Sequence, residues 1–192
     1  MKKITVKVEK ENYSMPARRF MLWLSMAGSG LIFGALIVAH AILTMAPKWK
    51  AFDQIPLVFW VSAGLIMASS YTMHRAKVLA QNDELDELKT FIALTLVMGV
   101  MFSVFQVLGW FEMISAYKQT GIRNAVAFIY ILSGLHMLHA LGGLGYLAYT
   151  THQAYQLNVH KKSMQLIEDC GTYWHFLDIV WVVVVAFLWI FN

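Results

Sequence analysis

Residues 173–191, YWHFLDIVWVVVVAFLWIF, make up an apolar stretch near the C-terminus that carries two ionisable side chains, His175 and Asp178. A membrane-spanning helix needs about 20 apolar residues, so this stretch is long enough to cross a bilayer. An Asp at the centre of such a helix costs about 2.5 to 3.5 kcal/mol on insertion scales, and embedded ionisable groups normally face the protein interior. The stretch therefore predicts a transmembrane helix with an inward-facing polar side.

The rest of the chain has the same apolar character. Of its 192 residues, 59% are hydrophobic and 14% charged, which is typical of an integral membrane protein. We expect an all-α, polytopic membrane bundle of five transmembrane helices in one domain over residues 20–192, preceded by a cytoplasmic N-terminal tail over residues 1–19. The expected spans cover residues of about 20–46, 55–75, 90–113, 125–150 and 173–191.

Lysine and arginine predict the orientation of these spans, because cytoplasmic flanks retain an excess of positive charge. With the N-terminus inside, eleven of the fifteen basic residues fall on cytoplasmic segments, and only Lys48, Lys50, Lys118 and Arg123 fall on outer loops. We therefore expect a cytoplasmic N-terminus and an external C-terminus. The basic residues form no single block, so the net charge of +4 does not indicate a nucleic-acid partner.

Two imidazoles in the fourth expected span suggest a metal or haem site as one interpretation. His136 and His139 are three residues apart and share one helical face. A lone His-x-x-His is a weak metal signal, because di-metal bundles also need several inward carboxylates, and the embedded acids here are Asp178 and at most Glu112. We predict no metal site, no catalytic residue and no cofactor in this chain.

Haem would need two axial histidines at matching depth. His40 lies late in the first expected span and His175 lies early in the fifth, which places them near opposite membrane faces. A stand-alone membrane protein with histidine-ligated haem or metal nevertheless stays open as an alternative.

The favoured interpretation is structural. We predict that His136, His139, His175 and Asp178 form a polar cluster between the last two spans, where an interhelical hydrogen bond is worth about 0.6 to 2 kcal/mol. We expect Trp174 and Trp181, seven residues apart, to make packing or lipid contacts. Small residues favour close helix packing, and we expect it at Gly30, Gly34 and Gly134. The single cysteine, Cys170, has no partner for a disulfide and is expected to be structural.

These motifs resemble subunit III of the haem-copper cytochrome oxidases. The likeness lies in residues 173–181, in Ser133-Gly134 with the two following histidines, and in Gln106 with Trp110-Phe111-Glu112. It covers essentially residues 20–191 and fits the short bacterial form with five helices. It also implies that Gln106 and Glu112 make packing or lipid contacts.

The chain departs from the family pattern at two positions. An alignment on Trp23-Leu24 places Ser29 where the family often carries a buried glutamate in the first of these spans. A second acidic position, near the end of the third span, falls on Gly109. Whatever those carboxylates do in other members, this chain lacks them.

The resemblance implies a non-catalytic subunit of a proton-pumping terminal oxidase in a bacterial inner membrane, as part of aerobic respiration. Haem and copper would then be held by oxidase subunits I and II, its expected partners. The subunit would pack on the catalytic subunit, bind phospholipid, and support proton uptake and stability. The alternative is an accessory subunit of a nitric oxide reductase, a class of protein that shares this helical pattern. Neither the electron donor, cytochrome c or quinol, nor membership of a larger respiratory supercomplex follows from the sequence.

Overall fold

The chain folds as a set of long helices, and the prediction of a five-helix membrane bundle is confirmed. A computed structural model describes residues 17–44, 57–120, 123–159 and 163–191. Each helix contains a segment long and apolar enough to cross a membrane. The helices are α1 (Ala17–Thr44), α2 (Leu57–Gln81), α3 (Leu85–Thr120), α4 (Arg123–Tyr155) and α5 (Gln165–Phe191).

Several helices begin earlier or end later than the apolar pattern predicts. The last helix begins at Gln165, ahead of the predicted start at residue 173, and the second continues to Gln81. These extensions contain charged residues, such as Lys77 in the second helix and Glu168 and Asp169 in the fifth, so the predicted apolar spans did not include them. Acidic side chains in a first turn, such as Glu168 of α5, are favourable because the helix N-terminus carries partial positive charge. The first helix begins at Ala17, three residues before the predicted start of the first span at residue 20. Residues 1–16 lie outside the described residues.

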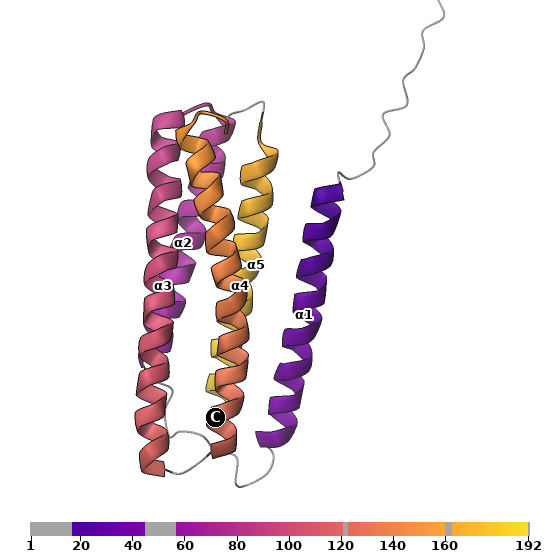
Figure 1. The fold of residues 1–192 in the computed structure, drawn as a ribbon, viewed down its shortest axis with the longest axis vertical. Coiled ribbons are helices and arrows are strands. Elements are labelled where there is room, and N and C mark those ends of the chain that lie inside the picture. Colours follow the sequence, from indigo (N-terminus) through magenta and orange to yellow (C-terminus); the bar gives the residue numbers. More distant parts are fainter. Residues whose placement is uncertain (1–16, 45–56, 121–122, 160–162, 192) are drawn as a thin grey trace, which may run out of the picture.

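Helices α2 to α5 form a four-helix bundle, and α1 packs on its outside. Around the bundle, α2 contacts α3, α3 contacts α4, α4 contacts α5, and α5 closes the ring on α2. The first helix contacts α5 and, less extensively, α4, and Figure 1 shows it standing apart from α2 and α3. It begins at one end of the bundle, and the last helix finishes at the other (Figure 1).

Buried apolar side chains fill the bundle in two clusters. One surrounds the ring of Trp181 with Phe59 and Phe102 and includes Phe33 of α1. The other, nearer the end where α1 begins, contains Trp174 together with the cysteine, which is buried as a free thiol. Large apolar side chains also cover the outer surface, among them Leu31, Leu138 and Trp189. Such a surface suits hydrocarbon, which replaces water around a membrane bundle.

Candidate functional site

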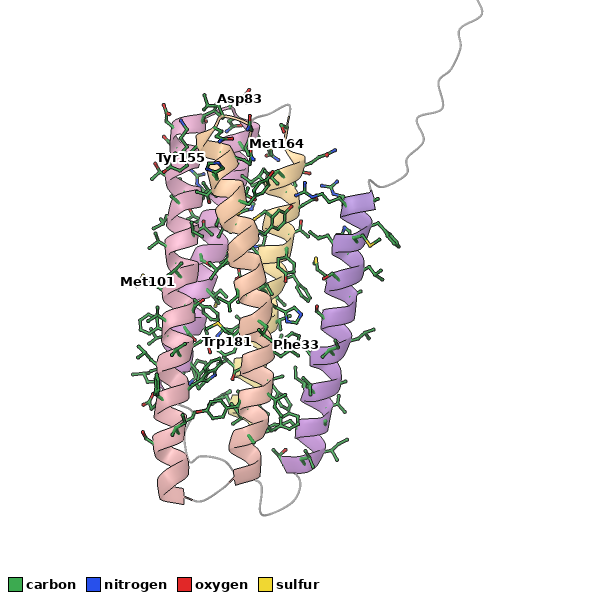
Figure 2. The ribbon with its side chains drawn as sticks, in the orientation of Figure 1. Phe33, Asp83, Met101, Tyr155, Met164 and Trp181 are labelled. Atoms are coloured by element: carbon green, nitrogen blue, oxygen red, sulfur yellow. The ribbon has the colours of Figure 1, made fainter. Side chains whose placement is uncertain are left out.

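His136 lies in a cage of aromatic rings at the centre of the first cluster. Its imidazole is fully buried and stacks on Trp181 of α5, with ring centroids 4.9 Å apart. Phe33 and Phe102 meet the same ring edge-on, at 6.1 and 5.8 Å. Figure 2 shows Phe33 and Trp181 at a similar level of the bundle. Neither imidazole nitrogen has a hydrogen-bond partner among the described residues, so this histidine is held by ring packing.

His139, one turn further along α4, instead hydrogen bonds to the outlying helix. Its Nδ1 lies 2.8 Å from the carbonyl oxygen of Leu135, which makes Nδ1 the donor, and its Nε2 lies 3.0 Å from Ser29 Oγ of α1. The serine hydroxyl then donates to Nε2, since a neutral imidazole has one donor and one acceptor nitrogen. Ser29 occupies the position at which the family resemblance predicts a buried glutamate. In this chain its hydroxyl joins α1 to α4.

His175 and Asp178 form a second polar group, where α5 faces α2. Ser70 Oγ of α2 lies 2.5 Å from His175 Nδ1, and Asp178 Oδ2 lies 4.0 Å from the same nitrogen. Asp178 is 4% exposed, yet neither of its carboxyl oxygens has a hydrogen bond to any described residue. Together, Ser70 and Asp178 line a pocket of about 400 Å³ between α2 and α5.

The structure thus divides the four predicted cluster residues into two groups. His136 and His139 face the aromatic core and α1, whereas His175 and Asp178 face α2, and among the described residues no hydrogen bond joins one pair to the other. A spacing of three residues puts two side chains on one face of their own helix. It does not determine which neighbouring helix that face meets.

The two predicted tryptophans are buried in the bundle and pack against other helices. Trp174 Nε1 donates to Ser69 Oγ at 3.1 Å, and Trp181 Nε1 donates to Ser62 Oγ at 3.3 Å. Both serines lie on α2, so each indole ties α5 to α2. Ser62 also accepts a bond of 3.1 Å from Gln106 Nε2 of α3, which makes it the meeting point of three helices.

Gln106 and Glu112 lie in different environments although both were predicted as packing or lipid contacts. Gln106 is buried, whereas Glu112 is exposed on the surface of α3. Between them, Gly109 packs against Phe59, whose ring would lie 3.3 Å from an added Cβ. A carboxylate at that position would require the phenylalanine ring to move.

Among the described glycines, Gly99 and Gly143 have the closest neighbours within this chain, whereas Gly30, Gly34 and Gly134 have room around them. An added Cβ would have nothing within 4 Å at Gly30, Gly34 or Gly134. At Gly99 the Trp174 ring would lie 2.6 Å away, and at Gly143 a methyl group of Leu177 would lie at the same distance. Within this chain, then, close approach occurs where α3 and α4 meet α5. The spacing of Gly30 and Gly34 places both on one face of α1, but it does not determine what that face contacts.

One set of interhelical contacts escaped the sequence reasoning. Arg19 of α1 bridges two acidic residues of α5, with Nη2 2.8 Å from Glu168 Oε2 and Nε 2.9 Å from Asp169 Oδ1. Beside it, Arg18 donates to the Tyr146 hydroxyl at 2.7 Å. The sequence contains a signal for these contacts, because Arg18-Arg19 precedes the first predicted span and Glu168-Asp169 precedes the fifth, both on the predicted cytoplasmic side.

Among the described residues, no group of three or more His, Cys, Asp or Glu side chains could hold a metal ion.

Comparisons with known proteins agree with this architecture. The family model for cytochrome c oxidase subunit III matches residues 33–192. Cytochrome c oxidase subunit 3 of Synechocystis sp. is 24% identical over 173 residues, which cover 86% of this chain and 72% of that protein. The corresponding protein of Thermostichus vulcanus is 23% identical over 84% of this chain and 81% of its own length. Cytochrome bo(3) ubiquinol oxidase subunit 3 of Buchnera aphidicola is 22% identical, over 88% and 89%.

Proposed function

The chain belongs to the cytochrome c oxidase subunit III family, and on that premise we propose that it is the non-catalytic subunit of its complex. As subunit III of a haem-copper oxidase, it is part of an oxidase assembly. We propose that haem and copper are held by subunits I and II, and that this chain packs on the catalytic subunit. Its role is to keep that subunit stable and supplied with protons.

The use of the buried polar side chains carries this proposal. His139 bonds to α1, His175 bonds to α2, and Ser62 joins α2 to α3 and α5. Each of these groups therefore makes at least one hydrogen bond to a neighbouring helix. Interhelical hydrogen bonds stabilise a membrane bundle by about 0.6 to 2 kcal/mol each. A side chain engaged in this way serves structure and is not free to act on a substrate.

An apolar groove supports the proposal that the subunit binds phospholipid. The groove lies between α3 and α4, has a volume of about 690 Å³, and is lined by side chains that include Val104, Leu108, Leu138 and Leu141. Its surroundings offer almost no hydrogen-bonding groups, which suits an acyl chain. We place the complex in a bacterial inner membrane, with the start of α1 on the cytoplasmic side as the basic residues predict.

Purification of the complex through a tag on this chain tests the proposed function. We expect haem-containing subunits to co-purify, and the chain separated from them to carry neither iron nor zinc. Oxidase lacking this chain should keep its haem absorption spectrum and reduce oxygen at first, then inactivate faster during turnover. Stoichiometric iron in the isolated chain would instead favour a histidine-ligated haem protein. Co-purification with a nitric oxide reductase would favour the accessory role in that enzyme.

A further inference from the structure

The pocket between α2 and α5 opens on the outer surface of the bundle. Its volume is about 400 Å³, and its lining includes the exposed aliphatic side chains of Met67 and Ile179. The polar lining groups are covered within the chain, because the Ser70 hydroxyl is bonded to His175 and both carboxyl oxygens of Asp178 are buried. The pocket therefore presents a mainly aliphatic surface to the membrane. An acyl chain packs against such a surface by van der Waals contact.

The helix face that lines this pocket continues to a lysine near the end of α2. One face of the helix carries residues at spacings of three, four and three: Met67, Ser70, His74 and Lys77. His74 and Lys77 both lie near enough to His175 of α5 to interact with it electrostatically. The pocket is thus followed, toward the helix end, by an exposed histidine and a lysine on the side that faces α5.

The ammonium group of Lys77 has no ion pair, hydrogen bond or ring contact with any described residue. The other basic side chains that the structure describes are engaged within the chain. Arg19 and Lys89 form ion pairs with acidic residues. Arg18 and Arg75 contact aromatic side chains. Lys77 is therefore able to pair with an anion from outside the described chain.

The depth of Lys77 matches that of a phospholipid headgroup. It lies four residues before the end of α2 at Gln81 and two residues beyond the predicted apolar span, which ends at residue 75. A lysine near a helix end extends its ammonium group to the interface, where the headgroups lie. Met67 lies ten residues deeper, which is about 15 Å at 1.5 Å per residue. A lipid with its phosphate at Lys77 therefore lays an acyl chain along the pocket.

We propose that Lys77 and the pocket between α2 and α5 form a binding site for an anionic phospholipid. The phosphate pairs with the Lys77 ammonium group and accepts a hydrogen bond from the His74 imidazole, while one acyl chain fills the pocket. Basic pockets between transmembrane helices on the cytoplasmic side bind anionic headgroups, and this end of α2 is the predicted cytoplasmic one. A zwitterionic lipid gains less from Lys77, because its headgroup already holds a cation beside the phosphate.

The inference rests on the phospholipid binding in the proposed function and adds headgroup selectivity to it. The groove between α3 and α4 has no charged side chain in its lining. We therefore expect that groove to take acyl chains whatever their headgroup, and the pocket beside Lys77 to prefer anionic lipids.

Photolabelling of the full chain in lipid vesicles tests the site. The vesicles consist of phosphatidylcholine with a small share of phosphatidylglycerol that carries a photoreactive group on one acyl chain. We expect peptide mapping to find adducts at the pocket residues Met67, Ile179 and Val183. The same photoreactive chain on phosphatidylcholine should label these residues about fivefold less, because a lysine near the membrane surface attracts anionic lipid.

Lys77→Gln separates headgroup binding from general contact with the membrane. It should lower labelling of the pocket by phosphatidylglycerol about fivefold and leave labelling of Leu138, in the groove between α3 and α4, unchanged. Lys89→Gln is the matched control, because Lys89 is paired with Asp86 of its own helix, and it should change neither. Equal labelling of the pocket by the two lipids, or no response to Lys77→Gln, would overturn the inference.

The same labelling in the purified oxidase separates this inference from the proposed function. We expect the pocket to stay labelled in the assembled complex. Loss of pocket labelling on assembly would show that another subunit covers it, and would overturn the lipid site while the co-purification still supports the proposed function. Absence of any co-purifying oxidase would instead refute the proposed function itself.

Discussion

The imidazole of His136 on α4 and the indole of Trp181 on α5 stack at the centre of the bundle, with planes inclined by 27°. Phe102 of α3 contacts both rings edge-on, so three helices meet in one aromatic group. His136 takes part through the face of its ring, and its nitrogens have no hydrogen bond to the described residues. The position therefore requires an aromatic ring more than it requires a histidine.

Replacement of His136 by phenylalanine tests this relationship. We expect the free energy of unfolding to change by less than about 1.5 kcal/mol. The ring contacts remain, and His136 makes no side-chain hydrogen bond to a described residue that the change could remove. His136→Ala should cost at least about 2 kcal/mol through the cavity it leaves. SDS-induced unfolding of the purified chain in detergent micelles measures both. A His136→Phe variant as unstable as the alanine variant would show that a nitrogen has a partner.

We expect the hydroxyl of Ser62 to stabilise the bundle, because its hydrogen bonds join α2 to α3 and α5. Alanine at this position leaves Gln106 Nε2 and Trp181 Nε1 without their common acceptor. A buried donor left unsatisfied costs about 1 to 3 kcal/mol. Ser103→Ala is the matched control, since that hydroxyl donates only to Gly99 of its own helix. Equal unfolding midpoints for the two variants would contradict the role of Ser62.

Neighbouring glycines of α4 should respond oppositely to alanine. At Gly143 a Cβ would lie 2.6 Å from a Leu177 methyl group, whereas at Gly142 nothing lies within 4 Å. We expect Gly143→Ala to lose about 1 to 3 kcal/mol by overpacking. Gly142→Ala should be neutral or more stable by up to about 1 kcal/mol, since alanine favours helix. Thermal unfolding of the purified chain followed by circular dichroism compares them, and a stabilising Gly143→Ala would show that α4 and α5 can separate there.

Arg19 is expected to hold α1 against the bundle. Arg19→Gln removes the ion pairs with Glu168 and Asp169. The buried Asp169 carboxylate then lies beside a neutral glutamine amide in place of a guanidinium. We expect faster hydrogen exchange of the α1 backbone amides, and a similar but smaller acceleration of the wild-type protein at high salt, which screens the partly exposed pairs. A double-mutant cycle of Arg19→Gln with Asp169→Asn should give a coupling energy near about 1 kcal/mol. Unchanged exchange in Arg19→Gln would place the attachment of α1 in other contacts, such as the Arg18–Tyr146 and Ser29–His139 hydrogen bonds.

The number and course of the helices follow from local properties of the sequence. A run of about 20 apolar residues predicts a span wherever it occurs, because hydrocarbon offers no partners for an unpaired backbone. The helix ends were less predictable: the eight residues from Gln165 to Thr172 are mostly polar or small yet helical. This segment packs on the bundle through the buried Ile167 and Cys170, and Glu168 and Asp169 form ion pairs with Arg19 of α1.

The sequence by itself determined which polar side chains lie at membrane depth, and the family to which they belong. Only the tertiary structure decided what each one contacts. His136 and His139 share a face by spacing, yet one is enclosed by aromatic rings and the other bonds to Ser29. His175 and Asp178 share a face too, and theirs meets α2 and an open pocket. The reason is physical: helical periodicity fixes directions around one axis, whereas a hydrogen bond depends on the distance to a second helix, which the packing of all the side chains sets.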